Sequence, residues 1–240
     1  MVIIIRKQKI PVLMLFLVLF GAMVLLLAQN GLPATETAAF DVSETSLVYV
    51  IDAGHGGEDG GAVAADGTAE SGINLAVALR LEYLMRFCGR ETQMIRREDV
   101  SIHVPGLETF RERKRSDLYQ RVEIVNGREP AVLLSIHQNS LPSVPSVHGA
   151  QVFFNNREGA DLLAEEIQTA LNQTVNTGNE KSTRKIPDSI YLMNHAAAPG
   201  VLVECGFLSN AAETQLLKTP PYQLKLAAAI LSGTLNADIA

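Results

Sequence analysis

Three polar residues of this sequence, His55, His137 and Glu204, share one kind of position at or just beyond the end of a short apolar run. His55 follows the run that ends at Ile51, and the other two close the runs AVLLSIH and VLVE. If these runs are parallel strands, their carboxyl ends meet at one edge of a sheet, where ligand sites of open α/β sheets collect. We therefore expect the three side chains to line one pocket.

Glu70 is a fourth candidate, because it stands at the start of a predicted helix and three residues before the apolar Ile73. This spacing places Glu70 on the buried side of that helix. A carboxylate is also favourable in the first turn of a helix, where the helix dipole favours negative charge. Its position alone is compatible both with stabilisation of the helix end and with metal ligation.

Two histidines and a carboxylate form the ligand set of many hydrolytic zinc sites, which leave one position open for water. Zinc lowers the pKa of that water to about 7, so that hydroxide is available at neutral pH. A second carboxylate that does not bind the metal can accept the proton and pass it to a leaving amine. Glu204 suits this role, because the three aliphatic residues before it indicate a partly desolvated carboxyl group with a raised pKa. A structural ion pair is the alternative interpretation of Glu204.

The stretch IDAGHGGEDGG around His55 is a glycine-rich loop. Its glycines allow the backbone to turn sharply and to approach a metal site closely. A phosphate-binding loop is the competing interpretation, and the sequence argues against it, because the chain lacks both common glycine motifs for phosphate and because Glu58 and Asp59 would repel an anion. Asp52 and Asp59 can either orient a ligating histidine or order the turn.

The other histidines and the cysteines are interpreted as structural. We expect His103 and His148 to be loop residues, and His195 to lie near the cleft without being a ligand. Cys88 and Cys205 both lie in apolar contexts, which favours two small core residues over a disulfide. The charged run 111–115 is predicted to be a solvated helical face.

The predicted elements that position these residues alternate between strands and helices. Such alternation indicates an α/β domain with a largely parallel sheet, and strands that are apolar on both faces are typical of covered central strands. The predicted strands are 47–51, 93–95, 131–136, 150–154, 191–193 and 200–203. The predicted helices are 70–88, 116–126, 158–173, a short one that Asn210 and Glu213 cap, and a last one over about 222–235.

Length and composition fit one globular domain and an additional segment. The chain has 240 residues, of which 47% are hydrophobic and 19% are charged, and a single domain of roughly 200 residues can bury a large core. The net charge of −6 and the lack of a basic stripe with interleaved aromatic residues argue against a nucleic-acid-binding protein.

The N-terminal segment has the pattern of an export signal or a membrane anchor. Arg6, Lys7 and Lys9 precede the uncharged apolar stretch 10–28. This stretch is longer than a typical signal-peptide core and about long enough to span a bilayer, so we favour an uncleaved anchor with its positive end inside. Cleavage near Ala28 or Ala39 is the alternative.

Both alternatives place the following domain outside the cytoplasmic membrane. Residues 29–45 are small and polar and lack periodicity, which is typical of a linker. The predicted organisation is therefore a signal peptide or membrane anchor over 1–28, a linker over 29–45 and one catalytic domain over 46–240.

Four motifs in this order, IDAGHGGEDGGA, Glu70 with INLAVALRL after it, LLSIHQNS and VLVECGFLSN, resemble the zinc-dependent N-acetylmuramoyl-L-alanine amidases of the Amidase_3 type. The resemblance implies that His55, Glu70 and His137 bind Zn²⁺ and that Glu204 is the catalytic carboxylate. It implies a mixed, mostly parallel central sheet of about six strands flanked by helices, which here follows an N-terminal hydrophobic helix. Matching framework and cleft-shaping residues are Arg96, Asp99, Leu118, Arg121 and Asn126.

The hydrophobic N-terminus and the stretch TRKIPDSIYLMNHAAAPGVLVECGFLSN are similar to one branch of this family, the germination-specific spore-cortex amidases of the CwlD type. This resemblance implies cleavage of the amide between N-acetylmuramic acid and L-alanine in peptidoglycan, as the first step toward the muramic-δ-lactam that marks the cortex for lysis. It also implies a possible lipoprotein activator as partner. The alternatives are a zinc peptidase that acts within the stem peptide and a non-catalytic wall-binding or activator protein.

Overall fold

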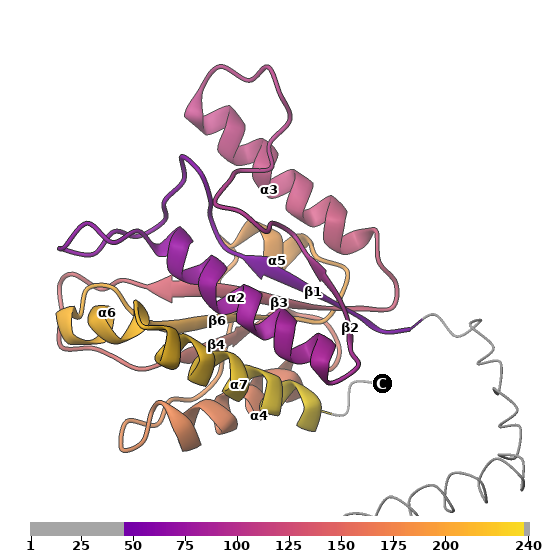
Figure 1. Cartoon of the computed structure of the whole chain (residues 1–240). Helices are drawn as coiled ribbons and strands as arrows, with labels where there is room; N and C mark the ends of the chain where they lie inside the picture. Colours follow the sequence, from indigo (N-terminus) through magenta and orange to yellow (C-terminus); the bar gives the residue numbers. More distant parts are fainter. Residues whose placement is uncertain (1–45, 238–240) are drawn as a thin grey trace, which may run out of the picture. The chain divides into compact units, whose positions relative to one another are not determined.

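The computed structural model describes residues 46–237 of the chain (Figure 1). The segment predicted to be a signal peptide or anchor, 1–28, and the predicted linker, 29–45, lie outside the described residues. Within residues 46–237, none of the helices combines the length and the apolar character that crossing a bilayer requires.

A six-stranded sheet forms the centre of the described domain, with the order β2-β1-β3-β6-β4-β5. β4 runs antiparallel to β6, and the other neighbouring strands are parallel. The mixed, mostly parallel sheet predicted from the sequence is therefore confirmed. The strands are β1 (Val48–Ala53), β2 (Glu91–Met94), β3 (Ala131–Asn139), β4 (Gln151–Phe154), β5 (Arg184–Lys185) and β6 (Gly200–Phe207).

Helices cover both faces of this sheet (Figure 1). One core lies between the sheet and α2, α4 and α7, and a second core lies between the opposite face and α3 and α5. Successive residues of β1 and β3 point alternately into the two cores, which explains why the first part of each strand is apolar on both faces. The helices are α2 (Glu70–Phe87), α3 (Phe110–Asn126), α4 (Ala160–Thr174), α5 (Tyr191–His195), α6 (Ala211–Leu217) and α7 (Pro220–Asn236).

Some predicted elements are wrong in type or extent. Residues 191–193 form the first turn of α5 rather than a strand, because periodicity does not distinguish a strand from a helix in so short an apolar run. α3 begins at Phe110, where Thr109 and Glu112 form a capping box, rather than at residue 116. α7 begins at its two prolines, which are favourable in a first helical turn. The short edge strand β5 has no apolar run and was missed.

The two cysteines are free, so a disulfide is absent from the described domain. Cys205 is buried in β6, as predicted, but Cys88 is exposed. Cys88 follows the last residue of α2, where the helix ends and the side chain is exposed. The apolar residues around Cys88 in the sequence do not indicate this exposure.

Two buried arginines hold the loop that follows β1. Arg121 of α3 donates hydrogen bonds to the carbonyls of Ala53 and His55 and pairs with the Asp52 carboxylate. Arg96 donates to the carbonyls of Ala53 and Gly54 from the other side. Buried carbonyl groups need a hydrogen-bond donor. Here the guanidinium N–H groups of the two arginines donate to carbonyls of residues 53–55, where a helix or sheet would use backbone N–H groups. Burial opposes ionisation of Asp52, yet the Arg121 charge holds the pKa of that carboxyl below its usual value.

Candidate metal centre and catalytic cleft

A cleft of about 400 Å³ opens at the carboxyl edge of the parallel strands. The four residues singled out from the sequence, His55, Glu70, His137 and Glu204, all line it. The sheet topology accounts for this convergence, because β1, β3 and β6 are adjacent and parallel and His137 is the direct register partner of Glu204.

The glycines beside His55 make room for this cluster. A Cβ atom on Gly54 would lie 2.2 Å from the His137 ring, and one on Gly61 would lie 2.5 Å from Oε2 of Glu70. His55 itself has a φ of 61°, which a residue with a side chain adopts rarely and usually at functional positions. The loop therefore brings its backbone close to the side chains of His137 and Glu70. A loop that only bound phosphate would not need glycines packed against these side chains.

Glu70 lies in the first turn of α2, but its carboxylate faces the histidines. Its Oε1 is 2.9 Å from Nδ1 of His137 and accepts the backbone N–H of Gln138 at 3.0 Å, and its Oε2 is 3.4 Å from Nε2 of His55. Burial by itself would raise the pKa of Glu70, but the hydrogen bond and charge of His137 outweigh burial and lower that pKa to about 2. The carboxylate is thus held ionised among the histidines.

The donor atoms fit a small divalent cation. One nitrogen of His55, one nitrogen of His137 and one carboxylate oxygen of Glu70 all lie within 4.8 Å of one another. Zinc binds nitrogen and oxygen ligands at about 2.0–2.2 Å, so an ion between these atoms can reach all three. Two imidazoles and one carboxylate leave a further position open, as in hydrolytic sites.

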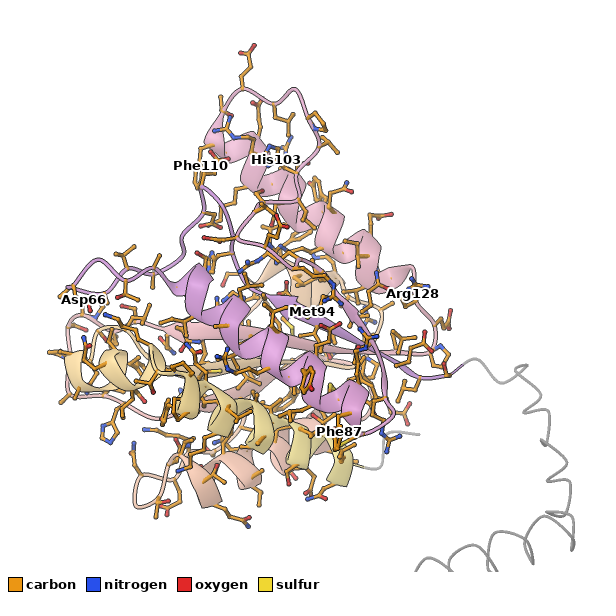
Figure 2. All side chains as sticks on the ribbon, in the orientation of Figure 1. Asp66, Phe87, Met94, His103, Phe110 and Arg128 are labelled. Atoms are coloured by element: carbon orange, nitrogen blue, oxygen red, sulfur yellow. The ribbon has the colours of Figure 1, made fainter. Side chains whose placement is uncertain are left out.

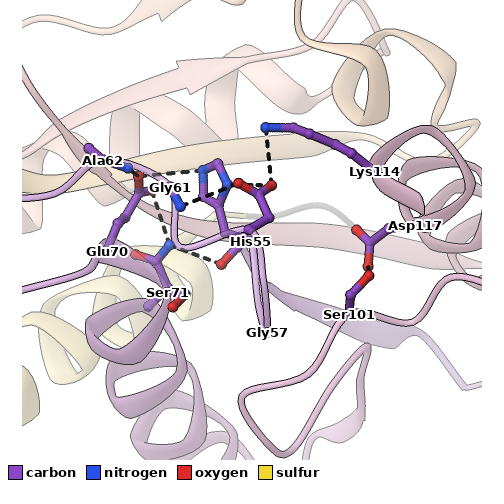
Figure 3. Close-up of polar contacts among 12 residues, drawn as sticks. His55, Gly57, Gly61, Ala62, Glu70, Ser71, Ser101, Lys114 and Asp117 are labelled. Atoms are coloured by element: carbon purple, nitrogen blue, oxygen red, sulfur yellow. Dashed lines mark hydrogen bonds and ion pairs between the residues drawn. The ribbon is translucent and has the colours of Figure 1, made fainter. Parts of the chain in front are cut away.

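Asp59 contacts Nδ1 of His55, whereas Glu70 lies near the other ring nitrogen, Nε2; Figure 3 labels His55, Glu70 and Lys114 of this cluster. Oδ2 of Asp59 lies 2.9 Å from Nδ1 of His55 and 3.1 Å from Nζ of Lys114 in α3. A carboxylate on Nδ1 fixes the tautomer in which Nε2 is free to bind a metal. Asp52 instead bonds to Arg121 and Ser135, so of the two aspartates it is Asp59 that orients the ring.

The charged run 111–115 is helical and mostly exposed, as predicted, but two of its side chains are paired with the loop after β1. Lys114 pairs with Asp59, and Arg113 pairs with Glu58 in the same loop. Periodicity places these residues on a helix, but it does not show that the loop after β1 packs against that helix.

Replacing Asp59 with alanine is expected to weaken zinc binding by about 10- to 100-fold, the usual cost of losing a carboxylate that orients a metal-binding histidine. Competition with a chromogenic chelator measures this affinity directly. Asp66→Ala is a matched control, because Asp66 also pairs with a lysine, at 2.8 Å from Lys218, on the exposed surface. Equal zinc affinity of the Asp59 variant and the wild type would contradict the assignment.

Glu204 stands apart from the other three residues, because it has no bond to either histidine. Its Oε2 is buried and lacks a hydrogen-bond partner among the described residues. Burial raises the pKa of Glu204 to about 7; the charge of His137 opposes this rise and that of Glu70 adds to it. A carboxyl group with a pKa near neutrality both accepts and donates protons efficiently.

The other histidines lie outside the cluster. His103 contacts Ser101 in a loop, and exposed His148 contacts the carbonyl of Ser146. His195 is in α5, where it stacks on Tyr191. Tyr191 lines the cleft, whereas His195 is not among its lining residues. Sequence reasoning missed this wall of the cleft, because residues 191–193 were assigned to a strand.

Comparisons with known proteins agree with this geometry. Residues 50–236 match the Amidase_3 family, described as N-acetylmuramoyl-L-alanine amidase. The germination-specific N-acetylmuramoyl-L-alanine amidase of Bacillus subtilis is 37% identical over 191 residues, which cover 79% of this chain and 78% of that protein. The amidase AmiA of Escherichia coli is 26% identical over 79% of this chain and 75% of its own length.

Solved structures show the same fold. The CwlD amidase of Clostridioides difficile, solved in complex with the GerS lipoprotein, has a TM-score of 0.76 and 35% identity, over 79% of this chain and 97% of that chain. The amidase AmiC2 of Nostoc punctiforme has a TM-score of 0.65 and 28% identity, over 79% of this chain and 96% of that one. The chain therefore belongs to the Amidase_3 family and is an N-acetylmuramoyl-L-alanine amidase.

Proposed function

We propose that this amidase holds zinc through His55, Glu70 and His137 and uses Glu204 as its acid/base group. The observation that carries the proposal is the convergence of the three donor atoms within 4.8 Å beside Glu204, whose buried Oε2 has no hydrogen-bond partner within residues 46–237. When bound, zinc would polarise the scissile carbonyl and lower the pKa of the attacking water.

The side chains of the protein transfer the protons and position the metal ligands. Glu204 accepts a proton from the water that attacks the carbonyl carbon and then donates a proton to the nitrogen of L-alanine, so that an acid and an amine are released. Glu70 is kept ionised by its hydrogen bonds, and Asp59 keeps Nε2 of His55 turned toward Glu70. Arg121 and Arg96 hold the loop that carries His55.

The proposed substrate is peptidoglycan, at the amide between the lactyl group of N-acetylmuramic acid and L-alanine. The likeness to the Bacillus subtilis germination-specific amidase supports a role in the spore cortex, in the formation of muramic-δ-lactam. The CwlD amidase of Clostridioides difficile was solved with a lipoprotein, which supports a lipoprotein activator as partner. We further propose export, with residues 1–28 as anchor or signal, 29–45 as linker and 46–240 as the catalytic domain.

Product analysis on purified cortex and vegetative peptidoglycan, with and without a chelator, tests this function. We expect stem peptides with free N-terminal L-alanine, released only without the chelator and more readily from cortex. Cleavage between amino acids would instead indicate the zinc peptidase alternative, and cleavage between sugars would contradict both. Binding to the wall without any cleavage would favour the non-catalytic alternative.

A further inference from the structure

Three aromatic rings form a continuous row beside the cleft, contributed by α3 and α5. The rings of Tyr119 and Tyr191 meet edge to face with centroids 5.2 Å apart, and His195 stacks on Tyr191 at 3.9 Å with an interplanar angle of 21°. The two helices that carry them lie on the same face of the sheet (Figure 1). We call these three residues the aromatic row.

Core packing and hydrogen bonds hold the aromatic row in place. Leu192 and Met193, which separate Tyr191 from His195 in α5, are buried in the core below. Asn126 at the end of α3 donates to the carbonyl of His195 and accepts the N–H of Ala197, which ties the two helices together. A preorganised surface loses little conformational entropy when a ligand binds.

The row is also open to solvent and continuous with the cleft. Tyr119 is 44% exposed, and Tyr191 lines the cleft together with Ser189, Ile190 and Leu118. Ile190 and Leu118 are apolar, Ser189 and Tyr191 each add a hydroxyl group, and none of these four lining residues is charged. In contrast, the side of the cleft at the loop after β1 carries the ion pairs of Asp59 with Lys114 and of Glu58 with Arg113. Figure 2 shows that Phe110 lies farther out, at the projecting start of α3, away from the sheet.

The substrate, like the cleft, has one part that is uncharged and one part that carries charged groups. The bond that is cleaved joins a sugar to a peptide, so each part extends from the metal centre in its own direction. A pyranose ring is rigid and uncharged and has an apolar face of C–H groups, which packs on an aromatic ring, whereas a stem peptide carries charged groups. Open aromatic surface next to a catalytic cleft marks a ligand-binding groove.

We propose that the aromatic row is a glycan-binding subsite, in which Tyr191 and Tyr119 pack against sugar rings of the strand that carries the scissile amide. His195 covers one face of Tyr191 and holds the plane of its ring. The subsite rests on the proposed cleavage of the muramoyl amide. It assigns the sugar to the side of the cleft at Tyr191, and the peptide to the side where the loop after β1 pairs with Arg113 and Lys114 near the start of α3.

The test is calorimetric titration of the zinc-loaded full chain with the two reaction products, glycan oligosaccharide freed of peptide and free stem peptide. We expect Tyr191→Ala to weaken glycan binding by about tenfold, the effect of losing about one aromatic packing interaction and its buried area. Tyr191→Phe keeps the ring and should bind glycan like the wild type. Binding of the stem peptide should be the same in all three proteins.

Tyr83→Ala serves as a matched control, because Tyr83 is 75% exposed on α2, which packs on the opposite face of the sheet; its glycan affinity should be unchanged. The proposal is overturned if the wild type does not bind the glycan, if Tyr191→Ala binds it equally well, or if peptide binding falls as much as glycan binding. The titration requires no turnover, so glycan binding without amide cleavage would refute the proposed function while supporting the subsite.

Discussion

Replacing Glu204 with glutamine is expected to lower kcat by about 10²- to 10⁴-fold, the usual contribution of a general acid/base group. Glutamine has nearly the same shape as glutamate but cannot accept a proton at neutral pH. Glu204 lies at the register position opposite His137, and its buried Oε2 has no hydrogen-bond partner in the part of the chain that the structure describes. The substitution therefore removes proton transfer without breaking a hydrogen bond of this oxygen. Turnover is measured from release of L-alanine-terminated peptide, and zinc content by elemental analysis.

The result separates catalysis from metal binding, because the variant should still contain zinc. Glu82→Gln is a suitable control: Glu82 of α2 is also buried, but it pairs with Arg97 and does not line the cleft. Its kcat should match that of the wild type. Full turnover by the Glu204 variant would refute the acid/base role, and loss of zinc would show that Glu204 belongs to the metal-binding set.

Replacing Glu70 with glutamine is expected to abolish activity through loss of the metal, with zinc affinity reduced by more than about 100-fold, beyond the cost of losing an orienting residue. Glutamine has nearly the same shape and keeps one acceptor oxygen, which replaces either Oε2 as acceptor of the Ala62 N–H or Oε1 as acceptor of the Gln138 N–H. The fold should therefore persist with the loss of one of these two bonds. Zinc at 100 times its Kd stabilises the folded chain by about 2.7 kcal/mol. This rise in Tm should be present in the wild type and absent in the variant.

Glu112→Gln is the matched control for Glu70. Glu112 is also in the first turn of a helix, but it forms a capping box with Thr109, whereas Ala69 caps α2 without a side-chain bond. The control should keep the full rise in Tm on addition of zinc. If Glu70→Gln kept that rise as well, Glu70 would serve only the helix end, which is the alternative that its sequence position left open.

Much of the fold follows from local patterns in the sequence. The apolar runs before His55 and up to His137 and Glu204 form most of β1, β3 and β6, because strand segments covered on both faces are mainly apolar. The same patterns failed at residues 191–193 and at β5, where three apolar residues or none are too few to define a period. Only packing on the sheet decides that residues 191–193 are helical.

The candidate site was likewise predictable from the sequence only in part. The sequence by itself predicted that His55, His137 and Glu204 share a cleft, because the carboxyl ends of parallel strands lie at one edge of a sheet. The strand order that makes these strands adjacent, and the choice between the two interpretations of Glu70 left open by its position in the first turn of a helix, depend on the tertiary structure. Only the tertiary structure decided between Asp52 and Asp59 as the partner of His55, brought Lys114 to Asp59, and placed Tyr119 against Tyr191. These contacts join segments whose approach depends on how α3 and α5 pack, and side-chain packing between distant elements leaves no periodic signal in the chain.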